Sequence, residues 1–162
     1  NLQHVDLAGF LLIVVRLFAT QRGLGMAYGP ELQVRFNALR RRRVPDLLFV
    51  STERMGILKT TQVDGAPDLI VEIVSPDSPA RDWREKYLEY EAAGVREYWV
   101  VDPLSQRFEG YTLGADGHYA LIEEKDGAVY SIVLAGFFLR PTWLWQEPLP
   151  NPLEILRELG VL

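Results

Sequence analysis

Two acidic side chains and one lysine stand where they could carry out metal-dependent hydrolysis. Asp46 opens the apolar run L-L-F-V, Glu72 lies inside the apolar run from Leu69 to Val74, and Lys86 ends the segment D-W-R-E-K. A charge inside a strand is costly unless it is paired or bound to a metal, so Glu72 needs a partner. An acid pair with a lysine predicts a phosphodiesterase site, with Asp46 and Glu72 as metal ligands and Lys86 as an electrostatic helper.

The metal expected at this site is Mg²⁺ or Mn²⁺, because the chain has no cysteine and only two histidines. Side chains alternate along a strand, so Asp68 shares a face with Glu72 and becomes a candidate auxiliary acid. Other interpretations remain open. Asp46 and Asp68 each follow a proline and could cap turns, and Glu72 could belong to a buried salt bridge.

The lysine is expected on a helix that follows the Glu72 strand. Apolar residues recur at helical spacing along this helix and predict its inward face: Trp83, Tyr87, Tyr90 and Gly94. Lys86 lies on the flank of that face, from which its ammonium can reach the sheet. The alternative is an Asp82–Lys86 pair along the helix, worth roughly 0.2–0.5 kcal/mol.

Length and composition bound the remaining possibilities. The chain has 162 residues, 48% of them apolar, and is expected to form one domain, with a core over about 4–102 and further strands and a tail over about 103–162. The net charge of −5 argues against a protein that binds nucleic acid over its whole surface. Binding through a local basic stripe such as Arg40–Arg43 remains possible. The apolar run Leu7–Ala19 is too short for a bilayer span, so we expect a cytoplasmic protein without a membrane partner.

The expected elements form an α/β sandwich with a mixed central sheet. A helix is predicted over Val5–Phe18, and strands over 26–36 and 47–50 are predicted to form an antiparallel pair. The central strand is Leu69–Val74. Further along the chain we expect a helix capped by Ser78 and Pro79 and ending at Ala93, a strand over 97–101, a β-meander over 107–113, 118–123 and 129–134, and a short helix over 153–159.

Three segments together resemble a known family. They are V-P-D-L-L-F-V, A-P-D-L-I-V-E-I-V-S and the stretch from D82-W83-R84-E85-K86 to D102-P103. They look like the Uma-type family of putative restriction endonucleases, within the PD-(D/E)xK nuclease superfamily. The resemblance implies an αβββαβ core, a Mg²⁺-dependent site and the superfamily acids at Asp46 and Glu72.

The resemblance also shows one departure from the superfamily pattern. The superfamily lysine normally lies two residues after the Glu, where this chain has Val74, and Lys86 on the following helix matches the substitute seen in related families. Further positions that match the family, without an implied role, are His4, Ser75, Asp82, Tyr90 and Asp102. Ser75 and Asp82 are therefore retained as auxiliary candidates.

The function expected from these observations is a Mg²⁺-dependent endonuclease that hydrolyses phosphodiester bonds, with DNA as the expected substrate. One alternative is a catalytically inactive nuclease fold that serves as a nucleic-acid-binding or assembly module. Another is a hydrolase that uses two carboxylates on a sugar without metal. Arg40–Arg43 would contact phosphates or form a solvated loop. The late aromatic residues Phe137, Phe138, Trp143 and Trp145 would either form a homodimer interface or cover one end of the sheet.

Overall fold

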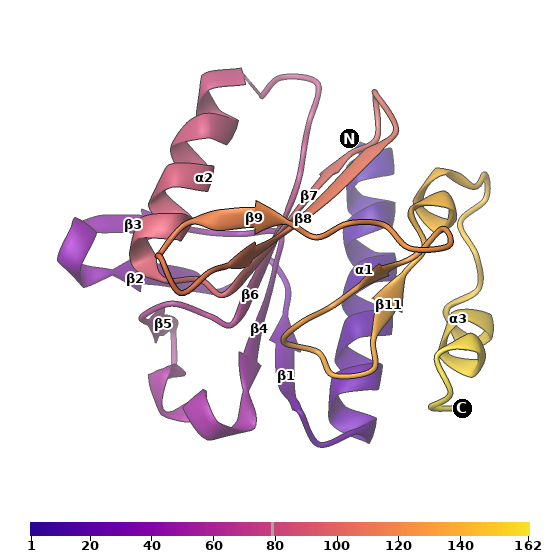
Figure 1. Ribbon diagram of the computed structural model, residues 1–162, viewed down its shortest axis with the longest axis horizontal. Helices are drawn as coiled ribbons and strands as arrows, with labels where there is room; N and C mark the ends of the chain where they lie inside the picture. Colours follow the sequence, from indigo (N-terminus) through magenta and orange to yellow (C-terminus); the bar gives the residue numbers. More distant parts are fainter. Residues whose placement is uncertain (79) are drawn as a thin grey trace.

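A six-stranded mixed sheet forms the centre of the molecule (Figure 1). The computed structural model describes residues 1–78 and 80–162. β6 pairs with β7 in parallel, whereas the other neighbours in the sheet are antiparallel. In spatial order the strands are β1 (Gly25–Tyr28), β4 (Leu47–Ser51), β6 (Leu69–Ile73), β7 (Glu97–Asp102), β8 (Arg107–Leu113) and β9 (Tyr119–Leu121).

One helix covers each face of this sheet. α1 (Leu2–Gln21) lies on one side and α2 (Ala80–Ala93) on the other, which confirms the α/β sandwich (Figure 1). α1 is long and apolar enough to cross a membrane by length and composition, but its inner side chains, including Leu11, Val15 and Phe18, are buried against the sheet. It is therefore the core helix that the apolar spacing predicts, extended at both ends.

α2 packs on the sheet through the aromatic residues of its inner face. Tyr90 is fully buried and joins Ile70, Tyr98 and Val100 in the apolar cluster on this side. Gly94 ends the helix with φ of 86°, a conformation that favours glycine. The predicted N-terminal cap falls partly on Pro79, which lies outside the described residues.

A small second sheet flanks the main one beside α2 (Figure 1). Its central strand β2 (Gln33–Phe36) pairs antiparallel with β3 (Arg41–Arg43) and parallel with β5 (Gln62–Asp64). The 3₁₀ turn η1 (Asn37–Leu39) joins β2 to β3 within this sheet, and η2 (Thr52–Ile57) lies between β4 of the main sheet and β5. The predicted antiparallel pair thus exists as β1 with β4, while the second half of the predicted 26–36 strand, after the Gly29–Pro30 turn, belongs to the other sheet.

The first two strands of the predicted meander are present as β8 and β9, which pair antiparallel, but its third strand lies elsewhere. β10 is shorter than predicted, Val129–Tyr130, and pairs with β11 (Phe138–Leu139) in a separate two-stranded sheet. Hydrogen bonds from residues 131–133 to the buried Glu97 draw this segment onto the α1 side. The chain ends with η3 (Pro141–Trp145) and α3 (Pro152–Glu158), and Phe137 and Trp143 pack into the α1-side core, as the predicted cover would.

Candidate active site

The register of β4 against β6 places Asp46 opposite Glu72. Leu47 pairs with Val71, so Asp46, which directly precedes β4, faces Glu72, the next residue on β6. Directly opposed residues in an antiparallel pair project to the same face of the sheet. The main-chain N–H of Asp46 donates a hydrogen bond to Glu72 Oε1 at 3.3 Å. Two acidic residues that lie 26 positions apart in the sequence are therefore neighbours across the β4–β6 pair.

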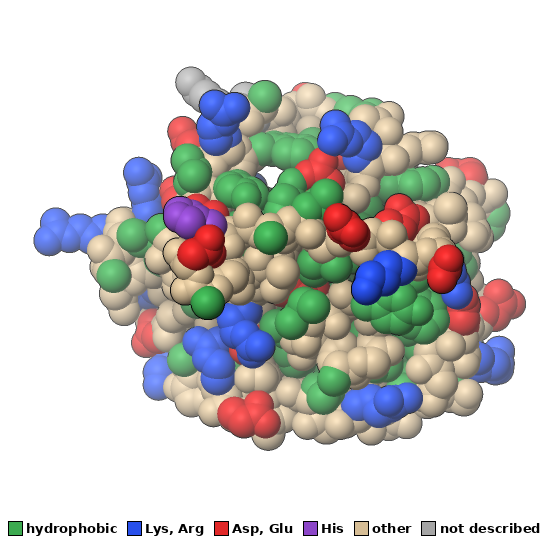
Figure 2. Space-filling model, in the orientation of Figure 1, with side chains coloured by type: hydrophobic (Ala, Val, Ile, Leu, Met, Phe, Trp, Pro, Cys, Tyr) green, Lys and Arg blue, Asp and Glu red, His purple; other side chains and the backbone are tan. Residues whose placement is uncertain are grey.

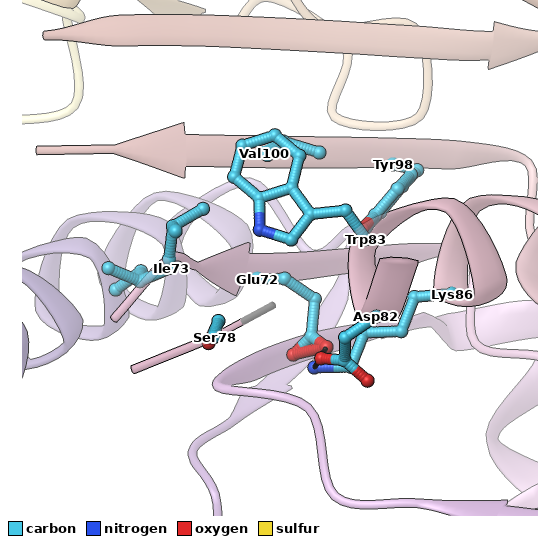
Figure 3. Close-up of a pocket in the computed structure, with 9 residues that line it drawn as sticks. Glu72, Ile73, Ser78, Asp82, Trp83, Lys86, Tyr98 and Val100 are labelled. Carbon is cyan, nitrogen blue, oxygen red and sulfur yellow. Dashed lines mark ion pairs between the residues drawn. The ribbon is translucent and has the colours of Figure 1, made fainter. Parts of the chain in front are cut away.

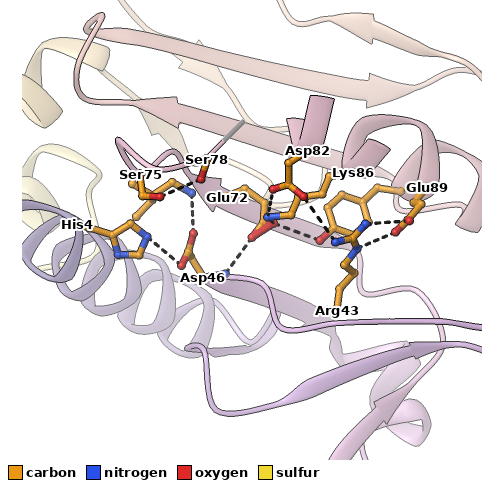
Figure 4. A network of polar contacts seen from close by, with 11 residues as sticks. His4, Arg43, Asp46, Glu72, Ser75, Ser78, Asp82, Lys86 and Glu89 are labelled. Atoms are coloured by element: carbon orange, nitrogen blue, oxygen red, sulfur yellow. Dashed lines mark hydrogen bonds and ion pairs between the residues drawn. The ribbon is translucent and has the colours of Figure 1, made fainter. Parts of the chain in front are cut away.

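Glu72 is buried, only 7% exposed, and its partners come from α2 (Figure 4). Lys86 Nζ lies 2.8 Å from Glu72 Oε2, and the Tyr90 hydroxyl donates to the same oxygen at 3.3 Å. Burial raises the pKa of Glu72, and the Lys86 ammonium only partly offsets this effect. Burial together with the Glu72 carboxylate raises the pKa of Tyr90 well above its ordinary value, so the Tyr90 hydroxyl stays protonated and donates.

Lys86 is placed as a fixed cation between two carboxylates. Besides Glu72, its ammonium contacts Asp82 Oδ2 at 3.3 Å, so both predicted interactions of this lysine occur together. Burial lowers the pKa of Lys86, but the attraction of Glu72 and Asp82 outweighs burial and the net shift is upward. Because the ammonium holds its proton, this side chain is suited to stabilise negative charge and not to accept a proton.

Asp46 is held on its other side by α1 and by β6. The main-chain N–H of Ile73 donates to Asp46 Oδ2 at 2.7 Å, and His4 Nε2 lies 3.2 Å from Asp46 Oδ1. His4 lies in the first turn of α1, and this turn packs beside Asp46, just before the start of β4 (Figure 4). The family-matched histidine thus contacts the predicted metal ligand directly, a contact that helical spacing could not have predicted.

A small cavity borders Glu72 and Lys86 on the α2 face. Figure 3 shows the two side chains beneath Trp83 and beside Asp82 and Ser78. The cavity volume is about 20 Å³, which suffices for roughly one water molecule. A water in this cavity would lie close to Glu72, Lys86 and Asp82, whereas Asp46 is not among the residues that line it.

The remaining candidates lie at different distances from this centre. Asp82 is part of it through Lys86, and the Ser75 hydroxyl is hydrogen-bonded to the Ser78 hydroxyl at 2.9 Å on the loop beside it. Asp68, four residues before Glu72 on the strand, binds the main-chain N–H of Ser51 and lies near Arg54 and Arg96. Asp102 accepts hydrogen bonds from Leu104 and Ser105 and so caps the turn after β7.

Asp68 is not brought together with the other predicted site residues. Four positions along a strand correspond to about 13 Å, and its contacts are with a main-chain N–H and two arginines. The structure instead favours the structural interpretation for this acid, because Asp68 is fully buried and holds β6 against the start of η2. Proline before an aspartate does not distinguish the two roles.

The sequence did not reveal the ion pairs that fix α2 over this site. Arg43 forms a two-pronged hydrogen bond with Glu89, at 2.7 and 2.8 Å, and its guanidinium also lies 3.9 Å from Asp82 (Figure 4). The sequence offers Arg40–Arg43 as a phosphate-contacting stripe or a solvated loop, and Arg43 fits neither, because its guanidinium points inward to Glu89. The only sequence signal was the spacing of Asp82, Lys86 and Glu89 along the helix.

The arrangement fits an oxygen-bound divalent cation. Asp46 and Glu72 occupy opposed positions on neighbouring strands, and the contact between them runs from the Asp46 main-chain N–H to Glu72 Oε1, so each carboxylate would be one oxygen donor to such an ion. Within residues 1–78 and 80–162 no group of three or more His, Asp or Glu side chains is set to hold a metal. Mg²⁺ usually keeps several waters and binds through one or two carboxylates, so a third side chain is not needed.

Comparison with known proteins agrees with this fold. A crystal structure of a putative nuclease belonging to DUF820 from Anabaena variabilis ATCC 29413 superposes with a TM-score of 0.72 and 21% sequence identity, covering 88% of this chain and 80% of that chain. A search of the curated proteins found no match. The family model Uma2, described as putative restriction endonuclease, matches residues 2–141. The family match and the shared fold support a nuclease, and the chain belongs to the Uma2 family.

Proposed function

We propose that this protein is a metal-dependent endonuclease that hydrolyses phosphodiester bonds in DNA, with Asp46 and Glu72 as ligands of Mg²⁺ or Mn²⁺. The observation that carries the proposal is that three residues far apart in the sequence lie next to one another in the structure. The β4–β6 register sets Asp46 opposite Glu72, and Lys86 Nζ lies 2.8 Å from Glu72 Oε2. An acid pair beside a fixed cation can hold both a metal and the charge of a phosphate.

Each residue has a distinct part in this proposal. Asp46 and Glu72 hold the cation, which when bound supplies Lewis-acid stabilisation and a more acidic water. Lys86, protonated and confined, stabilises the negative charge that develops on the scissile phosphate. Asp82 orients Lys86, and Tyr90 orients Glu72. His4 holds Asp46 through its Oδ1 atom. The family resemblance supplies nucleic acid as the substrate class, and DNA is the specific substrate we propose.

The decisive test is the Glu72→Gln variant, which keeps the size of the side chain and removes its charge. Isothermal titration with Mn²⁺ should show binding to the wild type and at least a tenfold loss of affinity in the variant, in line with the roughly tenfold or larger effects of changes near a metal. Cleavage of supercoiled plasmid DNA in Mg²⁺ should fall in parallel and stop in EDTA.

The matched control is Glu154→Gln on the exposed first turn of α3, which changes the same charge away from the site. Unchanged Mn²⁺ affinity in Glu72→Gln would remove Glu72 from the metal site. Cleavage that survives EDTA would contradict a metal-dependent mechanism and favour two carboxylates acting alone. DNA binding without cleavage would favour the inactive nucleic-acid-binding module, which Val74 at the usual lysine position leaves open.

A further inference from the structure

Four arginines that the candidate active site does not use gather on one hairpin of the small sheet. A hollow of about 240 Å³ is lined by Arg35, Phe36, Asn37, Arg40, Arg41 and Arg42, all from β2, η1 and β3. In Figure 2, Lys and Arg side chains project from the margin of the molecule where Figure 1 places this hairpin. The cluster is notable in a chain of net charge −5.

The two faces of the hairpin divide its arginines into two groups. Arg41 and Arg43 are paired with Phe36 and Val34, both buried beneath α2, and both guanidiniums reach Glu89. Arg42 is paired with Arg35 on the opposite face, since side chains alternate along a strand. The inner group fixes α2. The outer group, together with the exposed Arg40 at the end of η1 between β2 and β3, is available to bind an external ligand.

The outer arginines are placed against one another without a compensating carboxylate. Directly opposed like charges on a strand pair are destabilising, yet Arg35 and Arg42 occupy such positions. Among the residues that the structure describes, no carboxylate lies within 4.0 Å of the charged groups of Arg35, Arg40 or Arg42. Asp64 neighbours Arg35 in the sheet, but its carboxylate accepts from Gln62. An external anion would relieve this repulsion.

The hairpin adjoins the candidate active site along the chain. β3 ends at Arg43, and only Val44 and Pro45 separate it from Asp46. Four residues of extended chain span at most about 14 Å, so the main chain at Arg42 lies within that distance of Asp46. In a DNA duplex, the phosphates of each strand follow one another about every 3.4 Å along the helix axis. One strand could therefore touch the outer arginines a few nucleotides from the bond held at the acid pair.

From this geometry we propose that Arg35, Arg40 and Arg42 form the binding surface for the phosphodiester backbone of a nucleic-acid substrate, beside the acid pair. The inference rests on the proposed nuclease function and deepens it by naming the surface that holds the substrate. The contacts are to phosphates, which carry no sequence information, so this surface supplies affinity and position and not base recognition. Arginine suits the task because its planar fork matches phosphate oxygens.

The test compares two triple variants of equal charge. One replaces Arg35, Arg40 and Arg42 with glutamine, and the control replaces the exposed Lys59, Lys125 and Arg157 with glutamine. Binding to a short fluorescein-labelled DNA duplex is followed by anisotropy in EDTA, so that affinity is measured without hydrolysis. Circular dichroism and thermal unfolding establish that both variants are folded.

The hairpin variant should bind the duplex at least about tenfold more weakly at low salt. The slope of log affinity against log salt, measured between about 50 and 200 mM, should decrease by about 2 to 3, since each lost phosphate contact removes close to one counterion. The control variant should retain most of the wild-type affinity and slope. A matched RNA duplex tests whether the surface prefers one backbone.

Two results would overturn the proposal. If both triple variants lost affinity and slope equally, the effect would come from net charge and not from the hairpin. The second result is a wild type that binds neither duplex but binds vesicles containing an anionic phospholipid. If the hairpin variant then failed to bind these vesicles, the arginines would bind a membrane surface and not nucleic acid. Loss of duplex binding in the hairpin variant, combined with a wild type that never cleaves, would support this inference while contradicting the proposed catalysis.

Discussion

Two buried glutamates on neighbouring parallel strands serve the two faces of the sheet in different ways. Glu72 on β6 points toward α2, and Glu97 on β7 points toward α1. Burial raises the pKa of both carboxyls, so neither burial nor a pKa shift separates their roles. The donors that surround each carboxylate do separate them.

Glu97 is surrounded by fixed donors. Its two oxygens accept from Trp99 Nε1, the Ser131 hydroxyl and the main-chain N–H groups of Ile132 and Val133, at 2.6–3.1 Å, and the side chain is fully buried. Glu72 accepts from one main-chain N–H and otherwise from the side chains of Lys86 and Tyr90, beside a cavity. A carboxylate whose two oxygens accept from four donors stabilises the fold, whereas one held by a lysine beside a small cavity can take a ligand.

The largest effect is expected when Glu97 is replaced with alanine. The variant leaves a tryptophan N–H and two main-chain N–H groups buried without acceptors, which should lower the free energy of unfolding by about 3–5 kcal/mol. Urea unfolding measures this change. Glu72→Gln should lower the free energy of unfolding much less. If Glu97→Ala lowered it by less than about 1 kcal/mol, the two glutamates would not differ in their contribution to stability.

Lys86→Ala tests the side chain that distinguishes Glu72 from Glu97. Removal of the confined ammonium should lower kcat for plasmid cleavage about 10²-fold while changing Mn²⁺ affinity far less. Steady-state cleavage rates and titration of Mn²⁺ give the two quantities, with Lys125→Ala as a charge-matched surface control. An unchanged kcat would show that Lys86 has only a structural role, through its ion pairs with Glu72 and Asp82.

A smaller effect is expected at the inner arginines that hold α2 over the Glu72 site. Arg43→Gln breaks the two short hydrogen bonds to the mostly buried Glu89 and should cost about 1–2 kcal/mol of unfolding free energy. Arg41→Gln on the same strand removes an exposed partner of the same carboxylate at 3.6 Å and should cost under about 0.5 kcal/mol. Equal losses in thermal or urea unfolding would show that the two arginines do not differ as their burial indicates.

The sequence predicted Glu72 but passed over Glu97, although both lie in apolar strands. The resemblance and the run A-P-D-L-I-V-E-I-V drew attention to the first, while E-Y-W-V-V begins with its acid and looks like a strand with a polar end. The distinction depends on where residues 131–133 fold, more than 30 positions away. No local pattern contains that information, which also explains why the third strand of the meander was misplaced.

The sequence by itself determined the order of elements, the buried faces and the residue types of the site. Apolar periodicity is a local property, so α1, β6, α2 and β7 could be predicted within a few residues of their observed bounds. Only the tertiary structure decided which charges meet. The strand register set Asp46 opposite Glu72, helix packing brought His4 and Lys86 to them, and the twofold alternation of β3 separated Arg43 from Arg42. Contacts between charges depend on how whole elements pack, and packing is a property of the complete fold.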